Sequence, residues 1–382
     1  MLKKFKQITR LVIFTLPIVF ICSSCATEEM TSKKPNAVNA AASSIKSTSN
    51  SKNYKATLAT NLKVDATVDA SDVKNIPTLQ VTGKVFDKNK LLNMFFGSKA
   101  IKEKEEGGQS SFTVNNKNLR IPEEPGSFNF ITPLGDYITS IVNEEGEVNK
   151  FKLKELDFMT KSKATKQVTD MLKTIDITPH ISPKIYALDY NTLQKEQDVL
   201  MKDKTYKEFV DLGKTKIKDK WTKDDECYYM VFKIDMNGIL CYDSHYEMQS
   251  LDSMVSGSEV MVIISKNGIE SFNINGLIYN QKKSKVNTSP LISMQQAVES
   301  LKKKYSNVIL TDEMMVTDIS MVYLPVITSV GTTSNAGVSS NRQIEMVPCW
   351  YFNINATVNM QGMVENMPIE VRINAITGKE IL

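Results

Sequence analysis

Residues 227–232 read CYYMVF and residues 349–354 read CWYFNI, and these two stretches decide the fold. Both are rich in aromatic and aliphatic side chains, which pack well on the pleated surface of a strand. A turn follows each stretch, at Asn237-Gly238 after the first and near Gln361-Gly362 after the second. Two strands of the same kind are therefore expected at corresponding places in two related parts of the chain.

The segments around these stretches repeat as well. An amphipathic helix is expected before each, opened by Ser162 in one case and by Ser293 with its capping-box partner Gln296 in the other. Apolar residues keep to one face of each helix: Ala164, Val168, Met171, Leu172 and Ile175 in the first, and Met294, Ala297, Val298, Leu301 and Tyr305 in the second. A further strand and a glycine turn follow in both, at 259–270 and 370–380. Four features in the same order predict two repeated modules, each a helix on an antiparallel sheet.

The chain before the repeat shows a simpler alternation of apolar and polar residues, which is typical of a half-buried strand. The apolar members of this pattern are Leu62, Val64, Ala66 and Val68. A short helix is expected between the N-cap Asp87 and the stop signal Gly97. We therefore predict an α+β protein with a strand-rich N-terminal domain at 58–158, a first module at 159–285 and a second module at 286–382.

The extreme N-terminus has the order of a secretory signal, with four positive charges in the first ten residues and a mostly apolar run at 11–22. This run is 12 residues long, whereas a membrane-spanning helix needs about 20. Cys25 follows it and resembles the acylated cysteine of bacterial lipoproteins. We expect residues 1–24 to be removed as a signal peptide and Cys25 to carry the lipid. Ordinary signal-peptidase cleavage after Ser24-Cys25-Ala26 is the alternative.

Residues 25–57 comprise the lipidated N-terminus and a polar stretch of Ser, Thr, Ala, Asn and Lys. Such a stretch buries too little apolar area to offset its ordering entropy, so a flexible linker is expected. Removal of the first 24 residues leaves 43 basic and 43 acidic residues, and the mature chain then has no net charge. A nucleic acid is therefore not expected as a partner.

The end of the chain carries the most specific resemblance. The helix with an early alanine, the strand around Pro348-Cys349-Trp350 and the closing segment IEVRINAITGKE at 369–380 look like the PepSY-type module. The likeness covers residues 288–382 well and 162–282 loosely. The same segment is also similar to the C-terminal parts of the YycH and YycI families, envelope proteins that restrain a sensor kinase in low-GC Gram-positive bacteria. The resemblance implies an α+β module with a binding role, and it carries no functional residue onto this chain.

Three cysteines, at 227, 241 and 349, lie in the body of the chain, and an odd number cannot form a complete set of disulfides. In a two-residue hairpin around Asn237-Gly238, Cys241 faces Ile234, and Cys227 lies on the opposite face of its strand. This register excludes a bridge between Cys227 and Cys241 unless a bulge intervenes. It leaves either a bridge between Cys227 and Cys349 or buried free thiols.

Catalytic and metal-binding patterns are weak. Asp243-Ser244-His245 has the residue types of a hydrolase triad, but neighbours along one strand point to opposite faces and form no relay. The other histidine, His180, lies in a proline-flanked loop as a polar surface residue, and neither histidine has zinc-ligand spacing. The segment 235–238 has only the beginning of a calcium loop and is better explained as a hairpin turn. No cofactor, no metal and no enzymatic activity is expected.

The aromatic residues of the two decisive stretches allow two interpretations. A platform for a peptide or a glycan would be formed by Tyr228, Tyr229, Phe232, Trp350, Tyr351 and Phe352. The simpler interpretation is that Tyr229 and Tyr351, with alternate neighbours, form the core that faces each helix. The 19 methionines also suit either an adaptable binding surface or core filling.

The signal, the linker, the balanced charge and the repeat indicate a lipoprotein on the extracytoplasmic face of the cell membrane. We expect it to bind another envelope protein, either a sensor kinase or a secreted enzyme, without catalysis. A solute- or glycan-binding lipoprotein is the alternative, although such proteins usually alternate strand and helix around a hinge. An envelope hydrolase centred on Ser244 and His245 is the third interpretation.

Overall fold

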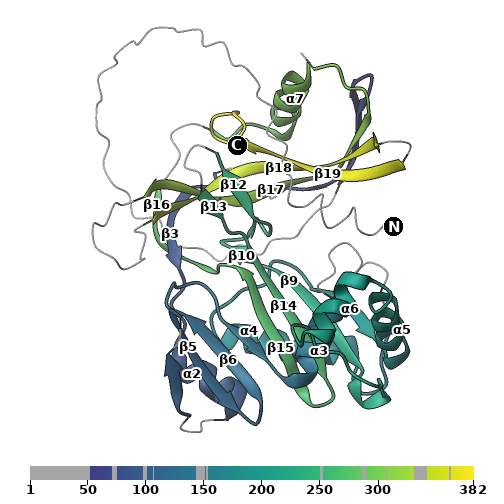
Figure 1. Ribbon diagram of the computed structural model, residues 1–382. Coiled ribbons are helices and arrows are strands. Elements are labelled where there is room, and N and C mark those ends of the chain that lie inside the picture. Colours follow the sequence, from purple (N-terminus) through teal and green to yellow (C-terminus); the bar gives the residue numbers. More distant parts are fainter. Residues whose placement is uncertain are drawn as a thin grey trace.

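The computed structural model describes residues 52–70, 75–97, 101–105, 107–142, 151, 154–249, 253–285, 290–306, 308–330, 342–360 and 363–382. The expected signal peptide, Cys25 and most of the expected linker lie outside these residues, as does the turn expected near Gln361-Gly362. The described chain is an α+β protein, as expected, and its strands gather in two large sheets, one above the other (Figure 1).

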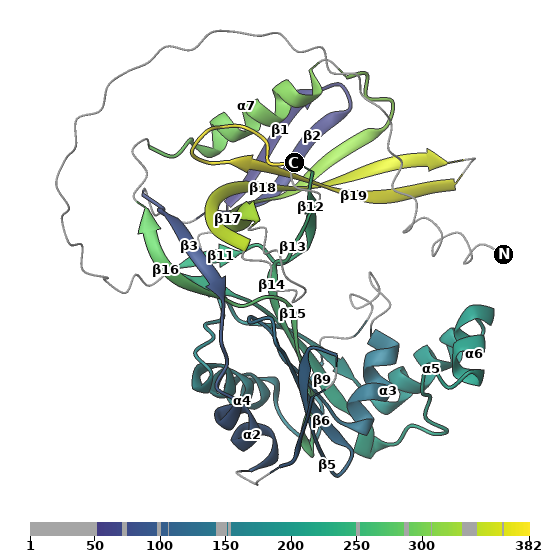
Figure 2. The same ribbon diagram turned by 60° about the vertical axis from the view of Figure 1, so that its left-hand side comes forward.

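The upper sheet contains nine of the described strands. Six follow one another in the order β1 (Lys52–Ala59), β2 (Leu62–Asp69), β17 (Glu313–Val330), β18 (Arg342–Met360), β3 (Thr78–Gly83) and β16 (Tyr279–Lys285). The others are β19 (Met363–Asn374), which pairs with β18, and the hairpin of β10 (Asp235–Met236) and β11 (Ile239–Cys241), which reaches β17. Strand β17 runs parallel to β2 and β11, and the other pairs are antiparallel. Helix α7 (Met294–Tyr305) covers one face of this sheet (Figure 2).

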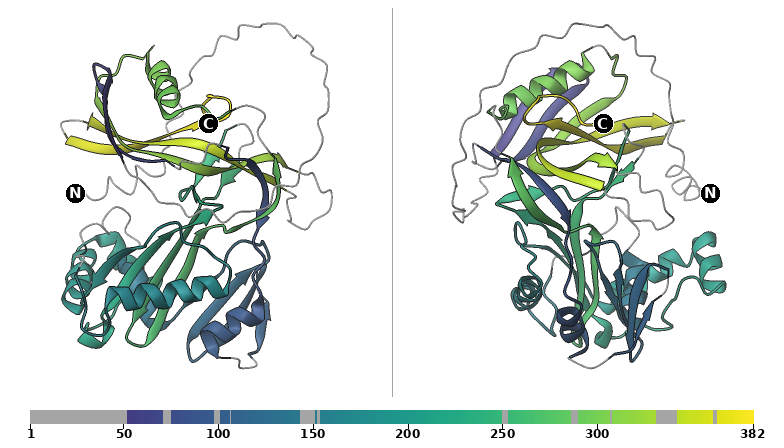
Figure 3. Two further views of the ribbon diagram at one scale, coloured as in Figure 1. Left: turned by 180° about the vertical axis from the view of Figure 1, so that it is seen from behind. Right: turned by 90° about the vertical axis from the view of Figure 1, so that its left-hand side faces the viewer.

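The lower sheet is antiparallel throughout its eight described strands. Their order is β4 (Glu103–Glu105), β5 (Gln109–Val114), β6 (Lys117–Pro122), β7 (Asn129–Ile131), β15 (Gly268–Gly276), β14 (Ser258–Ser265), β9 (Cys227–Lys233) and β8 (Lys184–Leu188). Helices α2 (Lys88–Phe96) and α4 (Lys161–Thr174) cover one face. The other face carries α3 (Pro133–Val142) and α5 (Tyr190–Leu200), with α6 (Lys204–Asp211) beyond them (Figures 2 and 3).

A small two-stranded sheet of β12 (Tyr246–Met248) and β13 (Ser253–Val255) lies on the upper sheet, on the face away from α7. Tyr246 and Val255 pack there against Val322, Leu324 and Cys349. The face away from α7, which is turned towards the lower sheet (Figure 1), is therefore partly covered by a segment that the chain inserts between two strands of the lower sheet.

Local signals in the sequence account for the helix ends. Ser293 and Gln296 form the expected capping box at the start of α7. The Asp87 side chain caps α2, and Gly97 ends it in a left-handed conformation with φ of 74°. Helix α4 differs slightly from expectation, because Thr160 and not Ser162 accepts the capping hydrogen bond. Both residues precede the same apolar face, so the helix itself is unchanged.

The Asn237-Gly238 hairpin has the expected register. Asp235 pairs with Leu240 and Met236 with Ile239, and the Cys241 N–H donates to the Ile234 carbonyl oxygen at 2.8 Å. Asn237 and Gly238 have φ values of 56° and 82°, the left-handed conformations that a tight hairpin turn requires.

The distribution of strands differs from the expected N-terminal domain. Strands β1, β2 and β3 belong to the upper sheet, whereas β4 to β7 belong to the lower sheet with β8, β9, β14 and β15. Residues 58–158 are therefore shared between the two sheets, and β16 at the end of the range 159–285 pairs with β3. The reason is physical: alternation identifies a strand and its buried face but does not identify its partner. The partner of β2 is β17, some 250 residues away along the chain.

The chain passes between the two sheets four times, near residues 83, 233, 257 and 276. Three of these crossings carry a glycine with no room for a side chain. A Cβ on Gly83 would lie 2.1 Å from the Pro125 oxygen, and one on Gly257 would lie 2.2 Å from the Ser244 oxygen. A Cβ on Gly276 would lie 2.2 Å from the oxygen of Gly257.

Backbone hydrogen bonds join the same crossings to one another. The N–H of Lys84 donates to the Ile278 oxygen at 2.7 Å, and the N–H of Leu277 donates to the Gly257 oxygen at 2.8 Å. The junction is therefore closely packed, and it holds the two sheets in one relative position.

Candidate functional site

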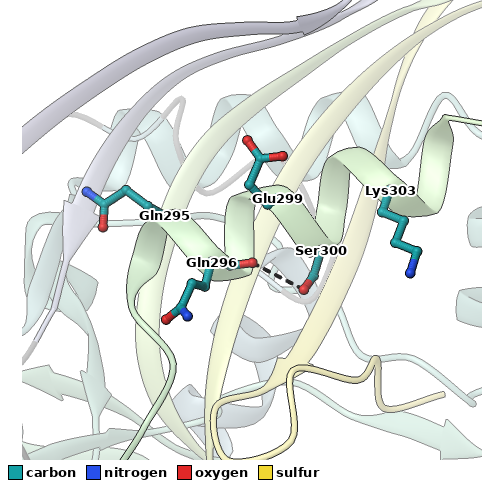
Figure 4. A pocket seen from close by; sticks show the side chains of 5 residues that line it. All are labelled: Gln295, Gln296, Glu299, Ser300 and Lys303. Carbon is teal, nitrogen blue, oxygen red and sulfur yellow. Dashed lines mark hydrogen bonds between the residues drawn. The ribbon is translucent and has the colours of Figure 1, made fainter.

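Three shallow hollows of the described surface lie along helices. The one on α7 is lined by Gln295, Gln296, Glu299, Ser300 and Lys303, which all project from a single helix (Figure 4). The Ser300 hydroxyl donates to the Gln296 carbonyl oxygen at 3.2 Å, an ordinary contact along a helix. The other two hollows follow α4. None of these linings brings together the groups of a catalytic or metal site.

Two further findings concern the described part of the chain as a whole. It contains no group of three or more His, Cys, Asp or Glu side chains placed to hold a metal ion. None of its helices has both the length and the apolar character needed to cross a lipid bilayer. One group of interacting polar side chains lies at the junction between the two sheets.

Five polar residues from three parts of the chain meet at this junction. Glu259 lies opposite Lys233 and Asn275 in the strand pairing, so these three side chains are neighbours on one face of the lower sheet. Asp243 Oδ2 lies 2.9 Å from Lys233 Nζ, and His245 Nε2 lies 3.1 Å from Asn275 Oδ1. The Asn275 amide donates to Glu259 Oε2 at 3.4 Å. These five residues are the junction cluster.

Burial governs the electrostatics of the junction cluster. It raises the pKa of Glu259, and the nearby Asp243 carboxylate raises this pKa further. Burial lowers the pKa of Lys233, but the charge and hydrogen bond of Asp243 outweigh burial and raise this pKa overall. Lys233 is therefore a compensated cation, whereas a positively charged group brought next to Glu259 would relieve the cost of its charge.

A second cluster adjoins the first on the face of the upper sheet away from α7. Tyr242 and Tyr351 both donate hydrogen bonds to the Glu370 carboxylate, Tyr351 at 3.0 Å. The Tyr242 ring meets the rings of Tyr246 and Tyr351 edge to face, with centroids 5.8 and 5.6 Å away. The guanidinium carbon of Arg372 lies 4.5 Å from the centroid of the Tyr246 ring. These five residues are the tyrosine cluster.

Hydrogen-bond donors dominate the tyrosine cluster. Burial and the Glu370 carboxylate raise the pKa of the Tyr242 and Tyr351 phenols, so both stay protonated and donate at physiological pH. Arg372 Nε and Nη1 are shielded from solvent and have no hydrogen-bond partner within the described structure. A cation–π contact with the Tyr246 ring stabilises this guanidinium.

Among the neighbours Asp243, Ser244 and His245, the first and the last contact different partners. Asp243 pairs with Lys233, and the His245 ring contacts Asn275. In the described structure no hydrogen bond joins Ser244 to His245, whereas a catalytic relay requires the base within reach of the nucleophile. His245 is exposed and Asp243, Glu259 and Asn275 are half-buried, so a bound molecule can contact these polar groups.

His180 is buried, in contrast to the surface position expected from its loop. Its side chain is 8% exposed, and its Nδ1 lies 2.8 Å from Asp235 Oδ2. The other carboxylate oxygen of Asp235 accepts from the Gly238 N–H at 2.8 Å. Both side chains therefore hold the Asn237-Gly238 hairpin, and the calcium-like start at 235–238 is the expected turn.

The three cysteines of the body, Cys227, Cys241 and Cys349, are buried and unpaired. Cys227 lies in β9 of the lower sheet and Cys349 in β18 of the upper sheet, so the bridge between them is not formed. Burial raises the pKa of all three thiols above the usual range. These residues act as small apolar side chains in the two cores.

The aromatic side chains face a different way from that expected. Tyr228 and Trp350 belong to the core that contains the α4 and α7 residues, whereas Tyr229 packs on the opposite face, towards α3 and α5. Tyr351 lies on the face of the upper sheet away from α7, in the tyrosine cluster. The assignment of Tyr229 and Tyr351 to the helix-facing core was wrong by one position, which reverses the face in a strand.

Glu370 and Arg372 were not expected at the site from the sequence. A signal for them exists, because these charged residues alternate with the buried Val371 and Ile373 in β19. Successive side chains of a strand point to opposite faces, so Glu370 and Arg372 lie together on the face opposite to Val371 and Ile373. Only the tertiary structure brings Tyr242 and Tyr246 onto that face.

No protein-family model matches the chain, and no curated protein matches it. A solved structure described as an uncharacterized protein from Eubacterium rectale ATCC 33656 is similar, with a TM-score of 0.60 and 17% sequence identity. The likeness covers 86% of this chain and 92% of that chain, so it extends over both sheets. At this identity it shows the fold alone.

Proposed function

We propose that the protein is a lipoprotein, anchored through Cys25 to the extracytoplasmic face of the cell membrane, which binds another envelope protein without catalysis. The pairing at the junction carries the proposal, because Asp243 contacts Lys233 and His245 contacts Asn275. Groups that a hydrolase needs for its relay are thereby committed elsewhere. The surface that remains is a set of polar and aromatic side chains suited to recognition.

The binding surface in this proposal consists of the junction cluster and of Tyr351, Glu370 and Arg372, the half-buried members of the tyrosine cluster, because Tyr242 and Tyr246 are buried. Both sheets and the segment between them contribute side chains, so the surface exists only while the sheets keep their relative position. The close glycine contacts at Gly83, Gly257 and Gly276 favour such a position. A preformed surface loses little conformational entropy on binding, which favours affinity.

We further propose that residues 159–285 and 286–382 contain two PepSY-like modules with a common origin. The order α4, β8, β9, β14 matches the order α7, β17, β18, β19, and both sets of strands are antiparallel. Both helices contribute to the same large core.

The strand registers support this equivalence. Cys227 pairs with Ser265, and Cys349 pairs with Asn374, so the two cysteines hold the same place in their strand pairs. Ser265 and Asn374 also act alike: the Ser265 hydroxyl accepts from the Asn267 N–H at 3.0 Å, and Asn374 Oδ1 accepts from the Ile376 N–H at 2.8 Å. Each side chain thus stabilises the glycine turn that follows its strand.

The resemblance to PepSY-type modules and to YycH and YycI guides the choice of partner. A sensor kinase or a secreted enzyme of the envelope suits a tethered, non-catalytic binder. A solute- or glycan-binding lipoprotein is the second candidate, and the tyrosine cluster favours it. Tyrosine edges, the Glu370 carboxylate and the Arg372 guanidinium together suit a small polar ligand.

In-cell crosslinking, affinity purification from the membrane fraction and mass spectrometry test the proposal. We expect a diacylglyceryl Cys25 on the N-terminal peptide and one reproducible envelope partner. His245→Ala with Asn275→Ala is expected to reduce capture, and Gln295→Ala with Glu299→Ala on α7 serves as the matched control. Point changes are needed because β17 lies between β2 and β18, so removal of residues 288–382 would dismantle the upper sheet.

An unmodified N-terminus and no partner would contradict the proposal. Thermal unfolding in the presence of sugars, peptides and amino acids then tests the second candidate. A ligand at 100 times its Kd adds about 2.7 kcal/mol to the free energy of unfolding.

A further inference from the structure

Helix α6 exposes apolar side chains that the fold does not need. None of its residues is buried, in contrast to the other five described helices. Phe209 is 40% exposed and Leu212, directly after the helix, is 60% exposed. Neighbouring large apolar side chains at a protein surface mark a place that something else covers.

The position of α6 indicates the shape of what covers it. Helices α3, α5 and α6 lie progressively farther from the lower sheet, and α6 is the outermost (Figure 2). Phe209 and Leu212 therefore lie on a projecting edge of the molecule. An extended surface can reach a projecting edge.

Positive charge accompanies the apolar pair. Residues 201–220 contain seven lysines and four acidic residues, a net charge of +3. Residues 25–382 are balanced, so the rest of the mature chain carries a net charge of −3. Lys204 and Lys214 flank the apolar pair and form no ion pair within the described structure. Lys214 Nζ lies 5.8 Å from the centroid of the Phe209 ring, so the charge and the apolar ring share one surface.

We propose that Lys204, Phe209, Leu212 and Lys214 form a docking surface for anionic lipid headgroups, the α6 surface. Interleaved lysines and exposed apolar residues on a short helix suit the boundary between headgroups and acyl chains. Anionic lipids add an attraction of the right sign for a stretch with a net charge of +3 in a mature chain whose other residues sum to −3. The inference rests on the proposed function, because a tether through Cys25 keeps the folded chain near a membrane.

The upper sheet offers a rival site that serves as a control. Val308 and Ile309 follow α7 and are 53% and 92% exposed. The last turn of α7 is basic, but its Lys304 pairs with Glu380. Two exposed apolar residues at the opposite end of the molecule thus allow a matched comparison with Phe209 and Leu212.

Sedimentation with lipid vesicles tests the proposal. The chain from residue 26 to 382 keeps the whole described fold, which begins at Lys52, and it lacks the acylated cysteine. We expect it to bind vesicles of phosphatidylcholine with phosphatidylglycerol and to bind vesicles of phosphatidylcholine alone only weakly. Phe209→Ala with Leu212→Ala is expected to lower the partition coefficient at least about tenfold, and Lys204→Gln with Lys214→Gln is expected to do the same.

Two control variants change the same number of groups elsewhere. Val308→Ala with Ile309→Ala, and Lys282→Gln with Lys283→Gln on the exposed strand β16, are expected to bind as the unchanged chain does. Absence of binding to anionic vesicles overturns the proposal, as does an equal loss in the control variants. Loss of partner capture by the α6 variants with vesicle binding intact also overturns it, because α6 is then a protein interface.

The same preparations separate this inference from the proposed function. An acylated Cys25 and a captured partner, without vesicle binding, overturn the α6 surface and leave the proposed function standing. An unmodified Cys25 removes the premise of both.

Discussion

Residues 161–276 and residues 294–374 share an order of elements but differ in what is added to it. In each region a helix precedes three strands that pair antiparallel, β8, β9 and β14 in the first and β17, β18 and β19 in the second, and β15 follows β14 in the first region. In the first region α5 and α6 separate β8 from β9, and β10 to β13 separate β9 from β14. In the second region the described residues add no element between the strands.

The difference teaches where the exposed chemistry of this protein lies. The corresponding parts of the two regions contribute to the core: Cys227 and Cys349 are buried, and both helices place residues in the large core. Asp243, His245 and the α6 surface all belong to the additions in the first region. A shared framework thus supplies stability, and the additions supply most of the surface that we propose for binding.

The largest expected effect compares a glycine of the junction, at the end of β15, with a glycine in the turn after β19. Gly276 and Gly378 have φ values of 89° and 70°, so alanine is strained at both. A Cβ on Gly276 would lie 2.2 Å from the Gly257 oxygen, whereas the atom nearest to a Cβ on Gly378 is 3.9 Å away. We expect Gly276→Ala to lower the free energy of unfolding by about 4 kcal/mol or more, and Gly378→Ala by about 1 kcal/mol. Urea unfolding measures both, and equal losses would contradict a tightly packed junction.

The second effect compares the turn-stabilising side chains. Ser265 is buried and donates to Glu270 Oε1 at 2.5 Å, besides accepting from the Asn267 N–H. Ser265→Ala leaves a buried carboxylate oxygen without this donor, for an expected cost of about 2 to 3 kcal/mol. Asn374→Ala loses bonds in a half-exposed turn, for about 1 kcal/mol. A larger loss at Asn374 in urea unfolding would reverse the ranking.

The third effect is the loss of unfolding free energy at alkaline pH, to which both regions contribute. Burial raises the pKa of Cys227 and Cys349 in the folded chain. The folded pKa lies above the unfolded value of about 8.5, so this contribution is complete below pH 8.5 and is lost as the pH rises. Each thiol is expected to cost about 2 kcal/mol between pH 8 and pH 10, measured by urea unfolding under reducing conditions.

Cysteine variants test whether the two regions contribute equally to this loss. Cys227→Ala and Cys349→Ala should each remove a similar part of the loss between pH 8 and pH 10. Rapid alkylation of either thiol in the native protein at pH 8.5 would contradict its burial.

The smallest expected effect is on the additions. Phe209→Ala with Leu212→Ala should change the free energy of unfolding by no more than about 0.5 kcal/mol, because neither side chain is buried and neither belongs to a core cluster. Thermal unfolding measures this change. A loss above about 2 kcal/mol would mean that α6 belongs to the core, and the vesicle results would then need another explanation.

Local structure could be predicted from the sequence, and pairing over long distances could not. The Ser293 and Gln296 capping box and the Asn237-Gly238 turn depend on neighbours along the chain, and both are present as expected. The parallel pairing of β2 with β17 depends on contacts between distant segments, and no local pattern contains it. This pairing places β1 to β3 in the upper sheet and away from β4 to β7.

The candidate site was accessible to sequence reasoning only in part. The relay at Asp243, Ser244 and His245 was excluded on the alternation of a strand, whereas the three residues lie in the connection between β11 and β12. Asp243 and His245 nevertheless have separate partners. The contact between His245 and Asn275 joins two segments that lie in different sheets or between them, so spacing along the chain could not reveal it. Tyr351 was assigned to the wrong face because a shift of one residue reverses every side chain in a strand.

Site-specific photo-crosslinking in cells tests the central claim most directly. One chain carries the photoreactive residue in place of His245 in the first region, and the other carries it in place of Glu299 on α7 in the second region (Figure 4). The account predicts one crosslinked envelope protein from position 245 and none from position 299. Crosslinks from position 299 alone, or equally from both positions, would contradict it.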